Sequence, residues 1–96
     1  MKAGLRERRV MAAVGRSVQA HREAAGLSRA QLAAALGVLP ATVASWEAGR
    51  VSLGVDTTWM IAAACGVPVT ALFDQVPKLP PRRIDVREFR QSPAAL

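Results

Sequence analysis

The chain has 96 residues, a formal net charge of +6 and 51% hydrophobic residues, which is enough for one modest core, so we expect one compact domain with tails. Nineteen of the hydrophobic residues are alanine, and the chain contains no tyrosine. Alanine favours helices, whereas β-branched and aromatic residues favour strands. The composition therefore argues against a sheet protein and predicts an all-α fold.

The sequence lacks the features of membrane proteins, metal-binding proteins and enzymes. No apolar run approaches the roughly 20 residues that a membrane-spanning helix needs, and no signal peptide is recognisable, so we expect a cytoplasmic, soluble protein without a membrane partner. The single Cys65 can form neither an internal disulfide nor a zinc site, and we expect no metal or cofactor. Paired carboxylates, a phosphate-binding loop and a nucleophile with its base are all missing, so an enzyme is not predicted.

The positive charge lies in the flanks of the chain. Residues 1–27 carry six basic and two acidic side chains, and residues 76–96 carry five and two. Residues 28–75 carry two basic and three acidic side chains. This balance favours binding to a polyanion such as nucleic acid.

A first helix is predicted from a 3-4-3-4 spacing that ends at Gly26. Whether it extends back through Leu5 is open at this point, because Gly15 weakens its middle. His21 falls on the apolar stripe, and without a catalytic neighbour it is interpreted as a packed core residue. The stripe consists of Met11, Val14, Val18, His21 and Ala25.

A second helix of about nine residues is predicted after Ser28, because Ser28 and Gln31 fit a capping box. Its apolar face contains Leu32, Ala33 and Leu36, and Gly37 follows where a left-handed residue would end it.

A third helix is predicted to open at Pro40, since proline fits the first helical position. Val43, Trp46 and Glu47 repeat at helical spacing, and Gly49 closes the helix. The second and third helices thus form a pair joined by a three-residue turn.

A fourth helix is predicted near Asp56 to Cys65, stopped by Gly66. Its predicted buried face carries Val55, Trp59, Ala62 and Cys65. Trp46 and Trp59 are both interpreted as core anchors, and Met60 and Cys65 as packing residues. Residues 68–73 are long enough for a short fifth helix.

The composition changes after Asp74, where three prolines within five residues disfavour helix. Residues 84–90 begin with alternating apolar and charged side chains and could add an edge strand to a partner or wrap the domain. We therefore divide the chain into a basic N-terminal extension at 1–13, a compact domain at 14–74 and a Pro-rich basic tail at 75–96.

The compact domain resembles the phage-repressor-like Cro/Xre helix-turn-helix family over about 60 residues. The resemblance rests on several motifs in one order. They are Leu27-Ser28, Leu32-Ala33, Gly37-Val38, Trp46-Glu47-Ala48-Gly49-Arg50, Ile61-Ala62, Gly66-Val67 and Ala71-Leu72-Phe73.

The resemblance implies that Arg22 and Glu47 form a structural ion pair and that the third helix enters the major groove of DNA. The groove residues would be Pro40, Ala41, Thr42 and Ser45, and the phosphate ligands Arg29 and Arg50. Here the sequence departs from the family, because residues 39–48 contain no Arg, Lys, Asn or Gln for bidentate base recognition. Base specificity would then depend on Thr42, Ser45, thymine methyl contacts, DNA shape or the flanks.

The leading hypothesis is a DNA-binding transcriptional regulator that binds double-stranded DNA as a homodimer, using the fourth and fifth helices or the tail to dimerise. The alternative is a protein-interaction module whose apolar Leu39-Pro40-Ala41 tip docks on a protein. An antitoxin or adaptor role, in which the tail binds a second protein, lies between the two. Arg6, Arg8 and Arg9 fit either a solvated arm or an arm that contacts DNA.

Overall fold

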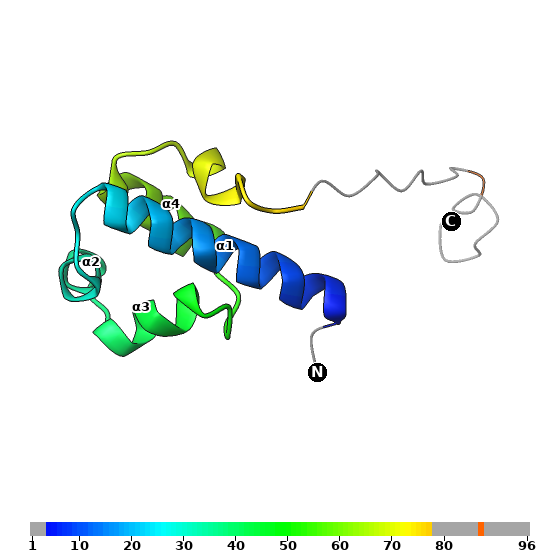
Figure 1. Cartoon of the computed structure of the whole chain (residues 1–96), viewed down its shortest axis with the longest axis horizontal. Coiled ribbons are helices and arrows are strands. Elements are labelled where there is room, and N and C mark those ends of the chain that lie inside the picture. Colours follow the sequence, from blue (N-terminus) through cyan, green and yellow to red (C-terminus); the bar gives the residue numbers. More distant parts are fainter. Residues whose placement is uncertain (1–3, 78–86, 88–96) are drawn as a thin grey trace.

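The computed structural model describes residues 4–77 and residue 87, and all regular secondary structure in this part of the chain is helical. Figure 1 shows a long first helix in front of the fourth, with the second to its left and the third below it. The α-helices are α1 (Leu5–Ala24), α2 (Arg29–Leu36), α3 (Pro40–Glu47) and α4 (Val55–Cys65), followed by the 3-10 helix η1 (Val69–Phe73). The all-α prediction is confirmed. The predicted short fifth helix is a 3-10 helix of five residues after Pro68, tighter than an α-helix, so the described residues contain four α-helices.

The helix ends follow the local signals in the sequence. The hydroxyl of Ser28 accepts a hydrogen bond from the backbone amide of Gln31 at 3.0 Å, and the backbone amide of Ser28 donates to Gln31 Oε1 at 2.8 Å. Gly37 ends α2 in the left-handed conformation, with φ of 71°. Pro40 occupies the start of α3. The capping box, the glycine stop and the proline start are therefore confirmed.

The first helix begins before the first residue of its predicted apolar stripe, Met11. It begins at Leu5, so residues 5–13 of the predicted N-terminal extension continue into the domain as helix. On the stripe, Val14 and Val18 are buried, His21 is half-buried and Ala25 is exposed. Residues 1–3 and most of the predicted tail, at 78–86 and 88–96, lie outside the described residues, including the proposed edge strand.

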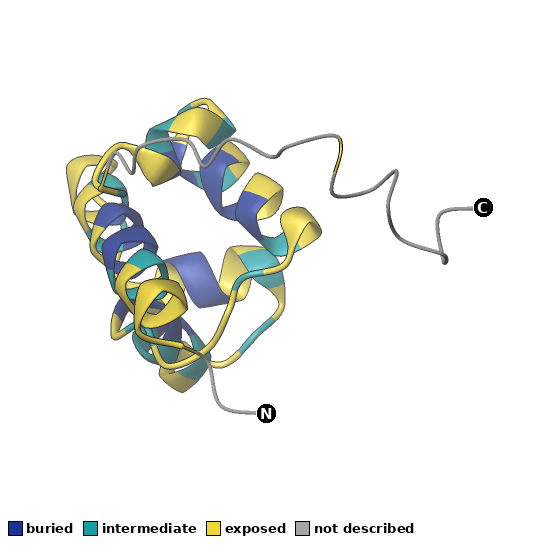
Figure 2. Cartoon of the chain, turned by 90° about the vertical axis from the view of Figure 1, so that its right-hand side faces the viewer, coloured by how far each residue is buried: buried dark blue, intermediate teal, exposed yellow. Residues whose placement is uncertain are grey.

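Every helix contributes at least one fully buried side chain larger than alanine to a single core. In Figure 2 the buried segments, in dark blue, lie on several helices around one centre. Because the contributions come from all five elements, burial of this core fixes how the elements pack on one another. The five residues are Val18, Leu32, Val43, Ile61 and Leu72.

The buried face of α4 differs from the predicted one. Ala62 and Cys65 are buried as expected, but Trp59 is 65% exposed and Val55 is 88% exposed. The core face instead runs through Thr58 and Ile61. These positions form the 3-4 repeat Thr58, Ile61, Ala62 and Cys65, which shares its last two residues with the predicted stripe. The interpretation of Trp59 as a core anchor was wrong, and Met60, at 45% exposed, is not packed either.

Two glycines allow α1 to approach the end of α3 closely. A Cβ atom on Gly15 would lie 2.5 Å from the Trp46 carbonyl oxygen and 2.6 Å from that of Glu47. Gly49 has φ of +71°, and a Cβ there would lie 2.8 Å from the Ala12 Cα. Gly15 is therefore required for packing, although it is a poor helix former.

A polar contact holds η1 against α1. The buried Ser17 hydroxyl donates to Asp74 Oδ1 at 2.7 Å. His21 Nε2 lies 3.1 Å from the Ala71 carbonyl oxygen and 3.2 Å from Asp74 Oδ2. His21 is thus a bridging polar residue at the edge of the core, with 24% of its side chain exposed, instead of the packed core residue that we predicted.

Candidate nucleic-acid interface

The α2–α3 pair presents the start of α3 to solvent. The turn is closed by a hydrogen bond from the Val38 amide to the Ala33 carbonyl at 2.9 Å. Ala33 is 1% exposed, which fits the need for a small residue where two helices cross. Leu39, Pro40 and Ala41 follow the turn and are all exposed.

The other end of α3 is held by a cluster of three charged residues, of which Arg22 and Glu47 are buried. Arg22 on α1 donates from Nε to Glu47 Oε2 at 2.6 Å and from Nη2 to Glu47 Oε1 at 3.2 Å. Its Nη1 donates to the Leu27 carbonyl at 2.9 Å. Arg22 and Glu47 are 7% and 6% exposed. The ion pair that the family resemblance implied is therefore present and buried.

Arg29, at the start of α2, is the third member of this cluster. It donates from Nε to Glu47 Oε1 at 2.9 Å, while 48% of its side chain remains exposed. The sequence analysis assigned Arg29 to phosphate and missed its contact with Glu47. The two residues are 18 positions apart in the chain, so no local sequence pattern signalled this contact.

The electrostatics of the cluster favour its charged form. Burial raises the pKa of Glu47, but hydrogen bonds from Arg22 and Arg29 outweigh that effect and hold this pKa below its ordinary value. The hydrogen bond to Glu47 raises the pKa of Arg22. The cluster therefore remains ionised at neutral pH and links α1, α2 and α3 through one carboxylate.

The remaining predicted site residues lie along one edge of the domain. Pro40 and Ala41 are exposed at the start of α3, and Thr42 and Ser45 are half-buried further along it. Arg50 is exposed directly after Gly49, beyond the end of α3. Leu39 precedes the helix and provides no side-chain cap for its first amides.

Other kinds of site receive no support in residues 4–77. Within this part of the chain there is no group of three His, Cys, Asp or Glu side chains that could hold a metal ion. Cys65 is buried, and burial raises the pKa of its thiol. None of the described helices combines the length and apolar character required to cross a membrane.

Two short helices around a tight turn, with the second anchored on the core and its start exposed, define a helix-turn-helix domain. The helix-turn-helix family model matches residues 18–72, and the chain belongs to this Cro/C1-type, Xre-like family of DNA-binding transcription regulators. No curated protein matches the chain. Among solved structures, the "Crystal Structure of Apo-HppE" is similar, with 31% sequence identity and a TM-score of 0.64. The similarity covers 67% of this chain and 36% of that one, so the matched region is about a third of the length of that protein.

Proposed function

We propose that this chain is a transcription regulator that binds double-stranded DNA as a homodimer, with α3 of each copy in the major groove. One observation carries the proposal. The family match covers the α2–α3 pair, and in this pair the end of α3 is buried at Glu47 while its start at Pro40 and Ala41 is open to a ligand.

The proposed roles follow the position of each residue. Pro40, Ala41, Thr42 and Ser45 lie at the groove, where apolar contact with thymine methyls and single hydroxyl hydrogen bonds are the available contacts. Arg50 contacts a phosphate, because it is exposed at the end of the motif. The free part of the Arg29 guanidinium contacts a second phosphate while Nε stays bound to Glu47.

Two copies are needed because α3 offers few base contacts. Residues 39–48 contain no Arg, Lys, Asn or Gln. One such helix gives little discrimination between base pairs. Two copies that bind two half-sites on one duplex combine the discrimination of both helices. The target is therefore a two-fold symmetric site in which shape and deformability contribute to selection.

The roles are tested by fluorescence anisotropy with a labelled duplex over a range of salt concentrations. Arg50→Ala is expected to weaken binding to all sequences alike and to reduce the salt slope by about one. The matched control is Arg16→Ala, an exposed arginine on α1 outside the α2–α3 pair, which should leave the slope unchanged. Equal slopes for wild type and Arg50→Ala would contradict the assigned orientation.

A second candidate function is favoured by the apolar tip of the pair. Leu39 is 71% exposed and is followed by exposed Pro40 and Ala41. An exposed leucine at this place fits a protein partner as well as thymine methyls. Leu39→Ala tests this candidate: an unchanged affinity for DNA together with loss of a partner captured by the wild-type chain would support the interaction module. The antitoxin or adaptor role of the tail remains a prediction on residues that lie outside the described part.

A further inference from the structure

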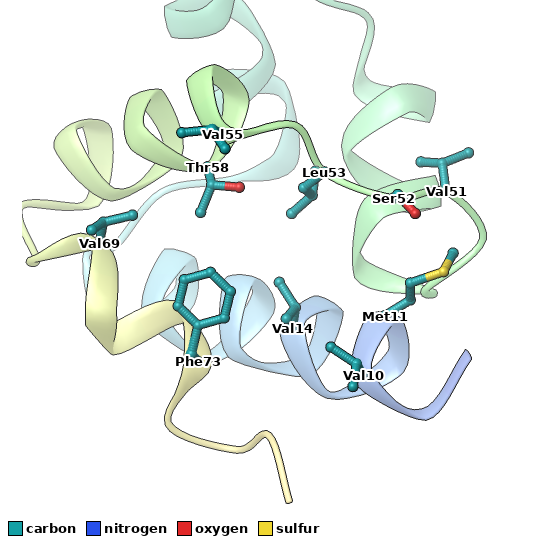
Figure 3. A pocket seen from close by; sticks show the side chains of 10 residues that line it. All are labelled: Val10, Met11, Val14, Val51, Ser52, Leu53, Val55, Thr58, Val69 and Phe73. Carbon is teal, nitrogen blue, oxygen red and sulfur yellow. The ribbon is translucent and has the colours of Figure 1, made fainter. Parts of the chain in front are cut away.

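A hollow of about 400 Å³ opens between α1, the loop before α4, the start of α4 and η1 (Figure 3). Its volume falls in the range of about 300–1,000 Å³ that small-molecule pockets usually have. In Figure 3 the side chains of Val14, Leu53 and Phe73 point into it. No residue of α2 or α3 lines this hollow, so it is separate from the exposed start of α3.

The lining of this hollow is apolar. Its polar side chains belong to Ser52 and Thr58, and the Thr58 hydroxyl already donates to the Gly54 carbonyl at 2.7 Å. Among the described residues, no charged side chain lines it. An ion placed here would lose its hydration without gaining a partner, so the hollow suits an apolar group.

A second, basic hollow of about 330 Å³ adjoins the first at Val10, which lines both. Its other lining residues are Leu5, Arg6 and Arg9 on α1 and Pro77 after η1. Both arginines are exposed, and neither forms an ion pair or a side-chain hydrogen bond within the described part of the chain. Two guanidinium groups are therefore available beside an apolar hollow.

We propose that the two hollows together bind a small carboxylic acid with an apolar chain, with its carboxylate at Arg6 and Arg9 and its chain in the larger hollow. Guanidinium groups pair with carboxylates through charge-assisted hydrogen bonds, often two at once. The larger hollow offers no charged partner and the smaller one offers two, so the acid is bound in one orientation. Glu7 and Asp56, in the first turns of α1 and α4, line neither hollow and do not compete with the ligand.

Charge favours such an acid over the other candidates for this space. A cationic apolar ligand would face the two arginines with like charge, and a neutral one would leave them without a partner. A second copy of the chain carries a net charge of +6, and residues 76–96 of its tail carry five basic and two acidic side chains. Both are therefore less suited to this basic site than a small anion.

Binding is tested by isothermal titration calorimetry of the full chain with octanoate. The matched probes are 1-octanol, which lacks the charge, and acetate, which lacks the chain. We expect saturable binding of one octanoate per chain, with an affinity about tenfold higher than that for either probe. Combining Arg6→Gln with Arg9→Gln should lower the affinity for octanoate about tenfold and leave that for 1-octanol unchanged. The control is Arg16→Gln, an exposed arginine on α1 that lines neither hollow, which should bind octanoate as wild type does.

Nuclear magnetic resonance then locates the chain of the ligand. We expect intermolecular nuclear Overhauser effects from octanoate to the Phe73 ring and the Val14 methyl groups. Phe73→Ala, at a position that is 48% exposed, should lower the affinity for octanoate about fivefold with an unchanged circular dichroism spectrum.

Three results would overturn the proposal. The first is the absence of saturable octanoate binding, and the second is equal binding by wild type and the double arginine variant. The third is a set of Overhauser effects from Phe73 to a second copy or to residues 84–90 with no octanoate bound, which would assign the hollow to that occupant. The site includes neither Arg29, Arg50 nor any residue of α3, so these results are independent of the proposed DNA contacts.

Discussion

The two ends of α3 have opposite environments. At its end, Trp46 and Glu47 are buried, and the carboxylate of Glu47 binds two arginines. At its start, Pro40 and Ala41 are exposed, with no side-chain cap before them. The end of the helix determines its position and the start determines what it can touch. Within the eight residues of α3, the buried end therefore serves the fold and the exposed start serves recognition. A substitution at one end can change one of these properties without the other.

The largest effect is expected from Glu47→Ala. It leaves Arg22 buried at 7% exposure without its carboxylate, and breaking such a pair costs about 3–5 kcal/mol. Urea unfolding followed by circular dichroism measures the loss. Glu23→Ala, at an exposed position on α1, is the control and should change stability by less than about 0.5 kcal/mol. A similar small loss for Glu47→Ala would mean that the cluster does not hold α3.

A second substitution tests the close approach of α1 to the same end of α3. Gly15→Ala adds a Cβ that would lie 2.5 Å from the Trp46 carbonyl oxygen, so the helices must move apart. We expect a loss of about 1–3 kcal/mol from this overpacking, although alanine is the better helix former. The change in thermal midpoint measures it. A stabilised Gly15→Ala variant would contradict the packing of α1 on α3.

Acid should weaken the buried end of α3. The pKa of Glu47 is lowered in the folded state by Arg22 and Arg29, so its contribution is present above the unfolded value of about 4.3 and is lost as the pH falls through the folded value. Urea midpoints measured between neutral and acid pH should fall for wild type and fall less for Glu47→Gln. The pKa of Asp74 is also lowered, by the hydrogen bond from the Ser17 hydroxyl, so Asp74 likewise loses its stabilising contribution in acid. Asp74→Asn is the matched variant that separates its contribution from that of Glu47. Parallel curves for wild type and Glu47→Gln would contradict the assignment.

The smallest effect on stability is expected at the exposed start of α3. Ala41→Gln should change the free energy of unfolding by no more than about 0.5 kcal/mol, because the position is exposed. It supplies a bidentate group for adenine, which is worth about 1–3 kcal/mol of discrimination in the major groove. Selection from random duplexes should therefore give a new adenine preference. No change in the selected site would argue that Ala41 does not face the groove.

The sequence predicts the parts of the fold that depend on local chemistry. Ser28 with Gln31, Gly37 and Pro40 set helix ends through neighbouring residues alone, and those ends are confirmed. Half of the predicted buried face of α4 was wrong, because Trp59 and Ile61 are both apolar and only packing against Leu72 and the other helices decides which is covered. The contacts of Asp74 with Ser17 and of Arg29 with Glu47 were missed, since they join residues far apart in the chain.

The most direct test of the account is selection of bound sequences from random duplex DNA with the purified full chain, together with the salt dependence of binding to the enriched duplexes. We expect a two-fold symmetric site bound with an affinity that falls steeply as salt rises. Failure to enrich any sequence, with no salt-dependent binding to duplex DNA, would contradict it.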